Sequence, residues 1–200
     1  IEQDGMFWVT DRDGHTVKKY SPDGELLLTL GTFGQWGCDP THFNGPTAVA
    51  VQRDGTIVVA DGYWNSRLVW YEPDGTFIKS IGEWGRGPAQ FNTPHALAID
   101  SQDRLLVADL CGGNFHDYMT VPGQIASHRT NTEDGCQHRI QVLDANGTFI
   151  EEWTHITPLS IATYGDKIYA SDKMSNLAVL NEKGEVLSRV DDIAIYIHQL

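Results

Sequence analysis

The stretch that decides the fold is "DGTIVVADGYWNSRLVWYEPDGTFIKSIG", residues 54–82. It contains three short apolar runs that are rich in β-branched and aromatic residues, and such runs predict β-strands. Polar turns separate the runs, and Asp-Gly pairs occur at 54–55 and 74–75. Because Asp-Gly suits the tight turns of hairpins, the stretch predicts a series of antiparallel strands.

The same pattern recurs along the chain. Its other copies are "DGMFWVTDRDGHTVKKYSPDGELLLTLG" from residue 4, "QDRLLVADLC" from 102 resuming as "HRIQVLDANGTFIEEW" at 138, and "GDKIYASDKMSNLAVLNEKGEVLSRV" from 165. In each copy the first run ends in an aspartate, at Asp11, Asp61, Asp109 and Asp172. A further apolar run begins at Pro46, Pro94, Pro158 and Tyr196. The repeat unit therefore has four short strands.

The spacing of the repeats indicates a β-propeller. The first two intervals between the repeated aspartates are 50 and 48 positions, and propeller blades have periods of about 40 to 50 residues. Helical periodicity is missing, so we predict an all-β fold. We expect blades at about 1–42, 43–88, 89–155 and 156–192, the start of another at 193–200, and a loop insertion at about 110–137. The chain thus covers about four blades of a larger ring.

Charge and hydropathy exclude several classes of partner. The 200 residues carry a formal net charge of -13, and the longest basic run is Lys18-Lys19. Such a chain repels phosphate backbones, so we expect no nucleic-acid partner. No apolar run is long enough to cross a membrane as a helix, so we expect no membrane partner.

Two of the eight histidines occupy matching positions in the repeat. The opening strands of successive blades carry Thr47, His95, Leu159 and His198 in register. In a six-bladed ring alternate blades lie a third of a turn apart, so three inward histidines could share one metal ion. Three imidazoles with an open fourth position suit catalytic zinc. The alternative is that these histidines are polar groups hydrogen-bonded inside the channel.

The clearest repeat copy resembles the NHL repeat. More narrowly, "DGYWNSR" at 61–67 followed by "GPAQFNTPHALAID" at 87–100 resembles the lyase domain of peptide-amidating enzymes, peptidyl-α-hydroxyglycine α-amidating lyase. The resemblance implies a six-bladed propeller with a three-histidine zinc on its axis. It places zinc ligands on His95 and His198, with the first ligand upstream of Ile1. It also makes Tyr63 the catalytic residue.

Other positions follow from the same resemblance. Asp61 and Arg67 belong to the motif, and we interpret them as structural, with Arg67 tying the strand turn to Asp61. The family's arginine for the substrate carboxylate belongs to a blade outside this chain. Tyr196 stands where the family has an active-site methionine, so we expect it to contact substrate. Gln199 stands where the family has an aspartate that helps hold a structural calcium, which leaves calcium without that ligand here.

Cys111 and Cys136 lie at the two ends of the predicted insertion. Neighbouring antiparallel strands begin to separate there, so the two sulfurs could be close enough for a disulfide. Two unpaired thiols are the alternative. An extracellular or periplasmic location is the weak expectation that goes with a disulfide.

Three classes of function follow. The first is a zinc lyase that cleaves a peptidyl- or acyl-α-hydroxyglycine to an amide and glyoxylate, in cooperation with a hydroxylating monooxygenase. In it Tyr63 would take a proton, which at neutral pH requires a nearby cation to stabilise the phenolate. The second is a non-catalytic NHL propeller that serves as a protein-interaction scaffold. The third is a calcium-dependent lactonase-type hydrolase, although the opening strands supply His, Thr and Leu instead of carboxylates.

Overall fold

The computed structural model describes residues 5–111, 138–172 and 176–191. These residues form fifteen strands joined by turns and loops. They contain no helix, and hence none with the length and apolarity needed to cross a membrane. The expected all-β fold is confirmed over this part of the chain.

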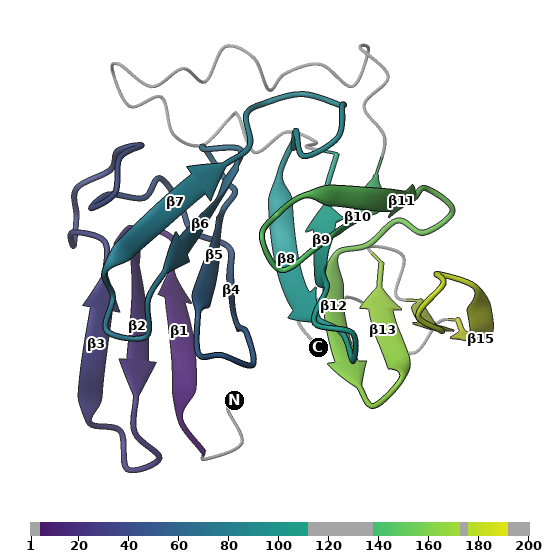
Figure 1. Ribbon diagram of the computed structural model, residues 1–200, viewed down its shortest axis with the longest axis horizontal. Coiled ribbons are helices and arrows are strands. Elements are labelled where there is room, and N and C mark those ends of the chain that lie inside the picture. The colour runs from purple at the N-terminus through teal and green to yellow at the C-terminus, as the bar shows by residue number, and fades with distance from the viewer. Residues whose placement is uncertain (1–4, 112–137, 173–175, 192–200) are drawn as a thin grey trace.

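The strands form four antiparallel sheets arranged as blades (Figure 1). The first is three-stranded, with β1 (Phe7–Asp11), β2 (Thr16–Tyr20) and β3 (Leu26–Leu30). The second has β4 (Ala48–Val51), β5 (Ile57–Asp61), β6 (Arg67–Tyr71) and β7 (Phe77–Ile81). The third has β8 (Pro94–Ile99), β9 (Leu105–Asp109), β10 (Arg139–Leu143) and β11 (Phe149–Trp153). The fourth has β12 (Ser160–Tyr164), β13 (Lys167–Ser171), β14 (Leu177–Leu180) and β15 (Val186–Val190).

Every sheet is a meander in which consecutive strands pair. Each also has the same irregularity: the register shifts where the outermost strand begins, between Lys19 and Tyr20, and again at the equivalent places in the other three sheets. A bulge of this kind accommodates one extra residue and bends the strand. The tight turn before the outermost strand thus has one geometry in all four blades.

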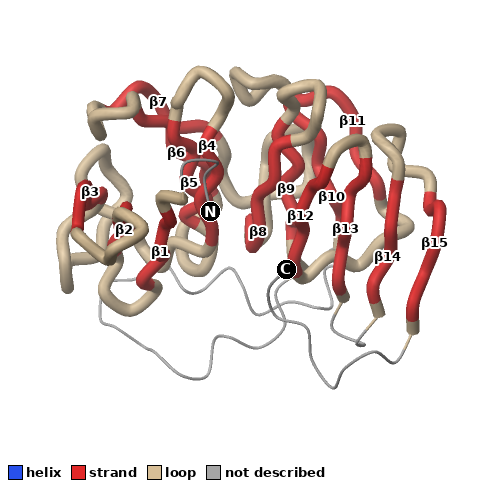
Figure 2. The backbone as a smooth tube through the Cα atoms, turned by 90° about the horizontal axis from the view of Figure 1, so that it is seen from below, coloured by secondary structure: helices blue, strands red, loops and turns tan. Residues whose placement is uncertain are grey.

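The innermost strands bring the blades together. β8 packs against β4 on one side and against β12 on the other, and the later strands of the fourth sheet follow one another outward from β12 (Figure 2). The middle strands β5, β6, β9 and β10 are buried at every position. By contrast β7 alternates between half-buried and exposed residues, as expected for a strand with one face near solvent.

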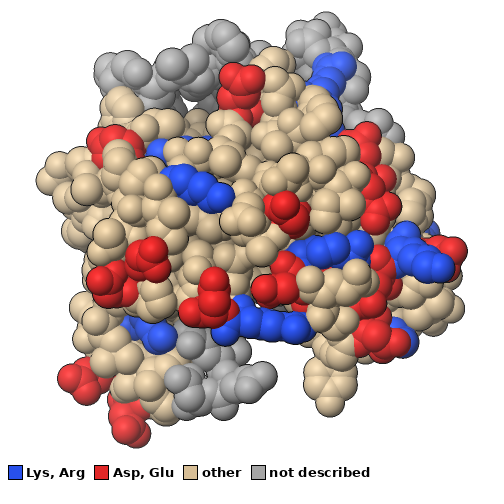
Figure 3. Space-filling view, viewed as in Figure 1, with Lys and Arg blue, Asp and Glu red and all other residues tan. Residues whose placement is uncertain are grey.

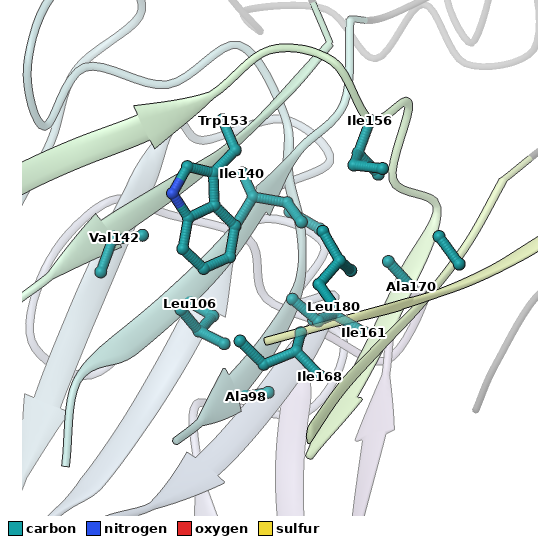
Figure 4. Close-up of a cluster of buried hydrophobic side chains, with 12 residues drawn as sticks. Ala98, Leu106, Ile140, Val142, Trp153, Ile156, Ile161, Ile168, Ala170 and Leu180 are labelled. Atoms are coloured by element: carbon teal, nitrogen blue, oxygen red, sulfur yellow. The ribbon is translucent and has the colours of Figure 1, made fainter. Parts of the chain in front are cut away.

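The hydrophobic core lies between blades rather than within them. Apolar side chains from adjacent sheets form three clusters, one at each blade boundary. Figure 4 shows the cluster between the third and fourth sheets, where Trp153 and Ile140 face Ile168 and Leu180. Because this burial needs a neighbour, each blade depends on the next for its stability.

Charged side chains are scattered over the face in Figure 3, and the basic ones form no large patch on that face. On the face in Figure 3, lysine and arginine side chains lie next to aspartate and glutamate. Several of these form ion pairs, for example Arg104 with Asp100.

Candidate functional site

The predicted site residues of the second and third blades meet where β5 ends and β8 begins. The turn at 62–66 joins β5 to β6, and its glycine allows a close approach to the next blade. A Cβ built on Gly62 would lie 2.1 Å from the carbonyl oxygen of Pro94. Thr47 ties the same two blades, since its hydroxyl donates to the Pro94 carbonyl at 2.6 Å. Glycine in "DGYWNSR" is therefore required by packing.

Asp61, the last residue of β5, holds this turn through hydrogen bonds to its carboxylate. Its carboxylate accepts hydrogen bonds from the backbone N–H of Asn44 at 2.8 Å and the side-chain amide of Asn65 at 2.7 Å. Arg67 Nε donates to it at 2.9 Å, and both side chains of the ion pair are buried. Burial raises the pKa of Asp61, while Arg67 and the amide donors oppose that shift.

The guanidinium of Arg67 also reaches the preceding connection. Its Nη2 donates to the carbonyls of His42 at 2.7 Å and Asp39 at 3.1 Å. The third blade repeats this device, with Arg139 Nε donating to Asp109 at 3.1 Å. Burial raises the pKa of Asp109 to about 6. The geometry of Asp61 and Arg67 agrees with a structural role in holding the turn.

Tyr63 and His95 lie in direct contact. The phenol oxygen of Tyr63 is 3.2 Å from Nε2 of His95, and the two rings are perpendicular with centroids 5.6 Å apart. Nδ1 of His95 is 2.8 Å from the carbonyl oxygen of Leu159 at the entrance to the fourth blade. A carbonyl oxygen can only accept, so Nδ1 carries a proton. In the neutral imidazole the lone pair then lies on Nε2 and points at Tyr63.

This arrangement suits a metal ligand. Metal-binding histidines commonly donate their other ring N–H to a backbone carbonyl, which sets the tautomer and the ring orientation. His95 is buried, with 6% of its surface exposed, in the innermost strand of its blade. Within the described ranges no three His, Cys, Asp or Glu side chains are grouped as a metal site. His198 and Tyr196 lie outside the described residues, so their predicted roles stay predictions.

Arg12 also lies beside Tyr63, and the sequence did not indicate this contact. Its guanidinium carbon lies 5.5 Å from the centre of the Tyr63 ring. Nε and Nη2 of Arg12 hold the carboxylate of Asp13 at 2.8 and 3.0 Å. The hydrogen bond to Asp13 raises the pKa of Arg12. Arg12 belongs to the turn after β1, 51 positions before Tyr63 in the sequence, and no local motif connects the two residues.

His15 supports the Tyr63 turn from the first blade. Its Nδ1 accepts the N–H of Gly45 at 3.2 Å, and the carbonyl of Gly45 accepts the N–H of Tyr63 at 3.1 Å. The His15 ring also packs against Trp64, with centroids 6.1 Å apart. Desolvation lowers the pKa of His15. No local sequence pattern connects His15 with Tyr63, because the contacts of His15 depend on how the first two blades pack.

Comparison with known proteins places this site in a recognised repeat. A family model described as the NHL repeat matches residues 43–71, which include Asp61, Tyr63 and Arg67. Residues 43–71 of this chain are thus similar to one NHL repeat. The NHL segment spans β4, β5 and β6, and so provides the turn that presents Tyr63.

Curated relatives support the narrower resemblance. The chain is 47% identical over 81 residues to peptidyl-glycine alpha-amidating monooxygenase of Mus musculus, over 39% of this chain and 8% of that protein. It is 39% identical over 82 residues to a probable peptidyl-alpha-hydroxyglycine alpha-amidating lyase of Caenorhabditis elegans, over 40% of this chain and 23% of that protein. The chain therefore spans less than a quarter of the length of either relative. The resemblance of this NHL-repeat chain to the amidating lyases is confirmed.

Solved structures agree on the fold. A structure of streptogramin B lyase superimposes with a TM-score of 0.61 at 16% sequence identity, over 97% of this chain and 53% of that one. At that identity the likeness concerns the fold alone. It supports the assignment of the four sheets to a propeller.

The cysteine prediction falls partly outside the described residues. Cys111, which follows the third blade's β9, is in a disulfide. Cys38 is a free, exposed thiol. Cys136 lies beyond the described ranges, so the pairing of Cys111 with Cys136 stays a prediction.

Proposed function

We propose that this chain forms part of the active face of a six-bladed NHL propeller that acts as a zinc-dependent lyase. Its substrate would be a peptidyl- or acyl-α-hydroxyglycine, R–CO–NH–CH(OH)–COO⁻. Cleavage of the C–N bond would release the amide R–CO–NH₂ and glyoxylate. The contact between Tyr63 and Nε2 of His95, with Nδ1 held by Leu159, is the observation that carries the proposal. The names of the relatives support the same reaction.

His95 is suited to hold zinc together with His198 and a third histidine from another blade. A bound zinc ion would supply Lewis acidity that lowers the pKa of the substrate hydroxyl. Nε2 of His95 has one lone pair, so it either accepts the Tyr63 proton or ligates a metal. If Nε2 of His95 held zinc, it would no longer accept a hydrogen bond from the Tyr63 hydroxyl, and the Tyr63 oxygen would be available to the substrate.

Tyr63 would act as the base. As the phenolate, which a nearby cation would stabilise, its oxygen would take the proton from the substrate hydroxyl as the C–O double bond forms and the C–N bond breaks. The departing amide nitrogen takes up a proton, so the reaction consumes none overall. Fixed geometry favours this role, because Gly62 and the support from His15 and Gly45 hold the Tyr63 turn against the next blade.

Arg12 offers a second cation for the substrate carboxylate, in addition to the arginine that the family resemblance assigns to a blade outside this chain. A guanidinium has two edges that can each hold a carboxylate. Asp13 occupies the edge formed by Nε and Nη2, which leaves the Nη1 side of Arg12 for a second anion. The Arg12 side chain keeps 46% of its surface exposed, so a substrate could reach it beside Tyr63.

A hydroxylating monooxygenase would supply the substrate, since the α-carbon of a terminal glycine must be hydroxylated before this cleavage. This role for a partner enzyme is part of the proposal. It requires only that the product of hydroxylation reaches the face that carries Tyr63.

The test uses the full-length protein that contains this chain. Glyoxylate release from a peptide ending in α-hydroxyglycine is measured with and without a chelator, and zinc content is measured in the same samples. Tyr63→Phe and His95→Ala should each reduce the rate at least about 100-fold, the usual scale for a general base. Tyr164→Phe and His155→Ala are matched controls, because Tyr164 is exposed and His155 contacts Gly184 away from this turn.

The outcomes separate the functions. Metal-dependent release that only the two site variants abolish supports the lyase. A folded, zinc-loaded protein without release above the uncatalysed rate rejects this reaction and favours a non-catalytic propeller. A protein that takes up no zinc would make His95 a hydrogen-bonded channel residue.

A further inference from the structure

The turn between β10 and β11 contains a tripeptide that the proposed lyase does not use. Asn146-Gly147-Thr148 is the single Asn-x-Ser/Thr sequence in the 200 residues, and this pattern is the acceptor for N-linked oligosaccharide. An Asn-Gly pair in a hairpin also has an ordinary explanation, because both residues tolerate left-handed backbone conformations. The geometry of the turn decides between these explanations.

The backbone of this turn does not need an asparagine. Gly147 adopts a positive φ of 80°, whereas Asn146 is not among the described non-glycine residues with positive φ. The backbone N–H groups of both Asn146 and Thr148 donate to Oδ1 of Asp144, at 2.9 and 2.7 Å. The side-chain amide of Asn146 therefore caps nothing in its own turn.

The equivalent turn of the second blade makes the contrast clear. There Asp74 precedes the glycine, and its carboxylate accepts the N–H of Thr76 at 2.8 Å. In the third blade Asp144 performs that task for Thr148 from two positions further back. Because Asp144 accepts the backbone N–H groups of this turn, the turn does not depend on the side chain of Asn146.

The turn is nevertheless held firmly through its backbone. The carbonyl of Ala145 accepts hydrogen bonds from Trp70 Nε1 at 3.2 Å and Gln52 Nε2 at 2.8 Å. The carbonyl of Asn146 accepts one from Lys79 Nζ at 2.8 Å. The side chains of Asn146 and Thr148 remain exposed. A large group on Asn146 would therefore point into solvent without disturbing the boundary between the second and third blades.

The disulfide at Cys111 adds an independent observation. Disulfides persist mainly in oxidising compartments, such as the lumen through which secreted proteins pass. Oligosaccharide transfer to asparagine takes place in the same compartments. An exposed acceptor and an oxidised cysteine in one chain point to the same environment.

We propose that Asn146 is an N-glycosylation site. An oligosaccharide would be transferred from a lipid pyrophosphate donor, with a new bond between its anomeric carbon and Nδ2 of Asn146. The bond from that carbon to the pyrophosphate oxygen breaks, the lipid pyrophosphate leaves, and Nδ2 loses one proton. The hydroxyl of Thr148 completes the acceptor. The proposal is independent of the lyase reaction.

The test is peptide mapping by mass spectrometry of the full-length protein secreted from cultured eukaryotic cells, before and after treatment with peptide N-glycosidase. Asn146→Gln and Thr148→Ala should each abolish the glycan on the peptide that contains position 146, whereas Thr148→Ser should retain it. Secretion and thermal stability of Asn146→Gln should match the unsubstituted protein, because the amide has no structural duty.

Asp74→Asn in the Asn146→Gln background provides a matched control, since it places the same tripeptide in the equivalent turn of the second blade. A glycan gained there shows that the cells modify this kind of turn. Secreted protein with an unmodified Asn146 overturns the proposal. If Asn146→Gln fails to fold, the unsubstituted protein and the Thr148→Ala and Thr148→Ser pair still decide the outcome, because Thr148→Ala leaves the asparagine in place.

Discussion

Replacement of Arg67 by methionine tests the energetic basis of the turn that carries Tyr63. Arg67 is 5% exposed and Asp61 is fully buried. Removing one member of a buried ion pair costs about 3 to 5 kcal/mol, because the remaining charge loses its compensation. Asn65 and the Asn44 N–H still donate to Asp61, so we expect a loss near the lower end, about 3 kcal/mol. The carbonyls of His42 and Asp39 also lose their shared donor.

The assay is denaturant unfolding of the full-length protein, followed by tryptophan fluorescence at pH 7.5 and pH 5. Burial already raises the pKa of Asp61, and loss of Arg67 removes the opposing charge. A raised pKa means that the folded state binds more protons than the unfolded state, so stability falls as pH rises. The difference between Arg67→Met and the unsubstituted protein should therefore shrink at pH 5.

Arg53→Met is the control, because Arg53 is largely exposed and its loss should change stability by less than about 0.5 kcal/mol. The combined Asp61→Asn and Arg67→Met variant should lose less than the sum of the two single variants. An Arg67→Met protein within about 1 kcal/mol of the unsubstituted protein, at both pH values, would refute the argument that Arg67 compensates a buried carboxylate.

Three further predictions concern the same face. Gly62→Ala should lower the free energy of unfolding, measured by urea titration, by about 1 to 3 kcal/mol, since its Cβ would meet the Pro94 carbonyl at 2.1 Å. Gly24→Ala is the control in the same titration: Gly24 has open space but a positive φ, so this variant reports turn strain without a clash. Desolvation lowers the pKa of His15, so the folded state binds fewer protons than the unfolded state, and stability should rise with pH up to the unfolded pKa of about 6.5. In His15→Asn the free energy of unfolding should differ less between pH 5.5 and pH 7.5 than in the unsubstituted protein, and an unchanged difference would exclude His15 as its source. If the lyase proposal holds, Arg12→Met should raise KM for an α-hydroxyglycine peptide about 10-fold, the scale of one charged hydrogen bond, with a smaller effect on kcat. Equal KM values for the variant and the unsubstituted protein in steady-state assays would show that Arg12 does not bind the carboxylate.

Much of the fold could be predicted from the sequence because its causes are local. Apolar runs with Asp-Gly turns specify short antiparallel strands, and their repetition at 50 and 48 positions specifies blades. The position of His95 in the repeat register singled it out, whereas Tyr63 was indicated by the resemblance of "DGYWNSR" at 61–67 to the amidating lyases. The sequence thus determined the all-β repeat and pointed to two residues, Tyr63 and His95, that are in contact in the structure.

Contacts between blades could not be predicted in this way. His95 takes its tautomer from Leu159, 64 positions away, and Tyr63 lies beneath Arg12 from the first blade. The repeat period describes each blade separately, whereas these hydrogen bonds depend on the angle and distance at which one blade packs on the next. Tertiary structure therefore decided which of the predicted residues meet, because only the packed blades bring their turns within hydrogen-bonding distance.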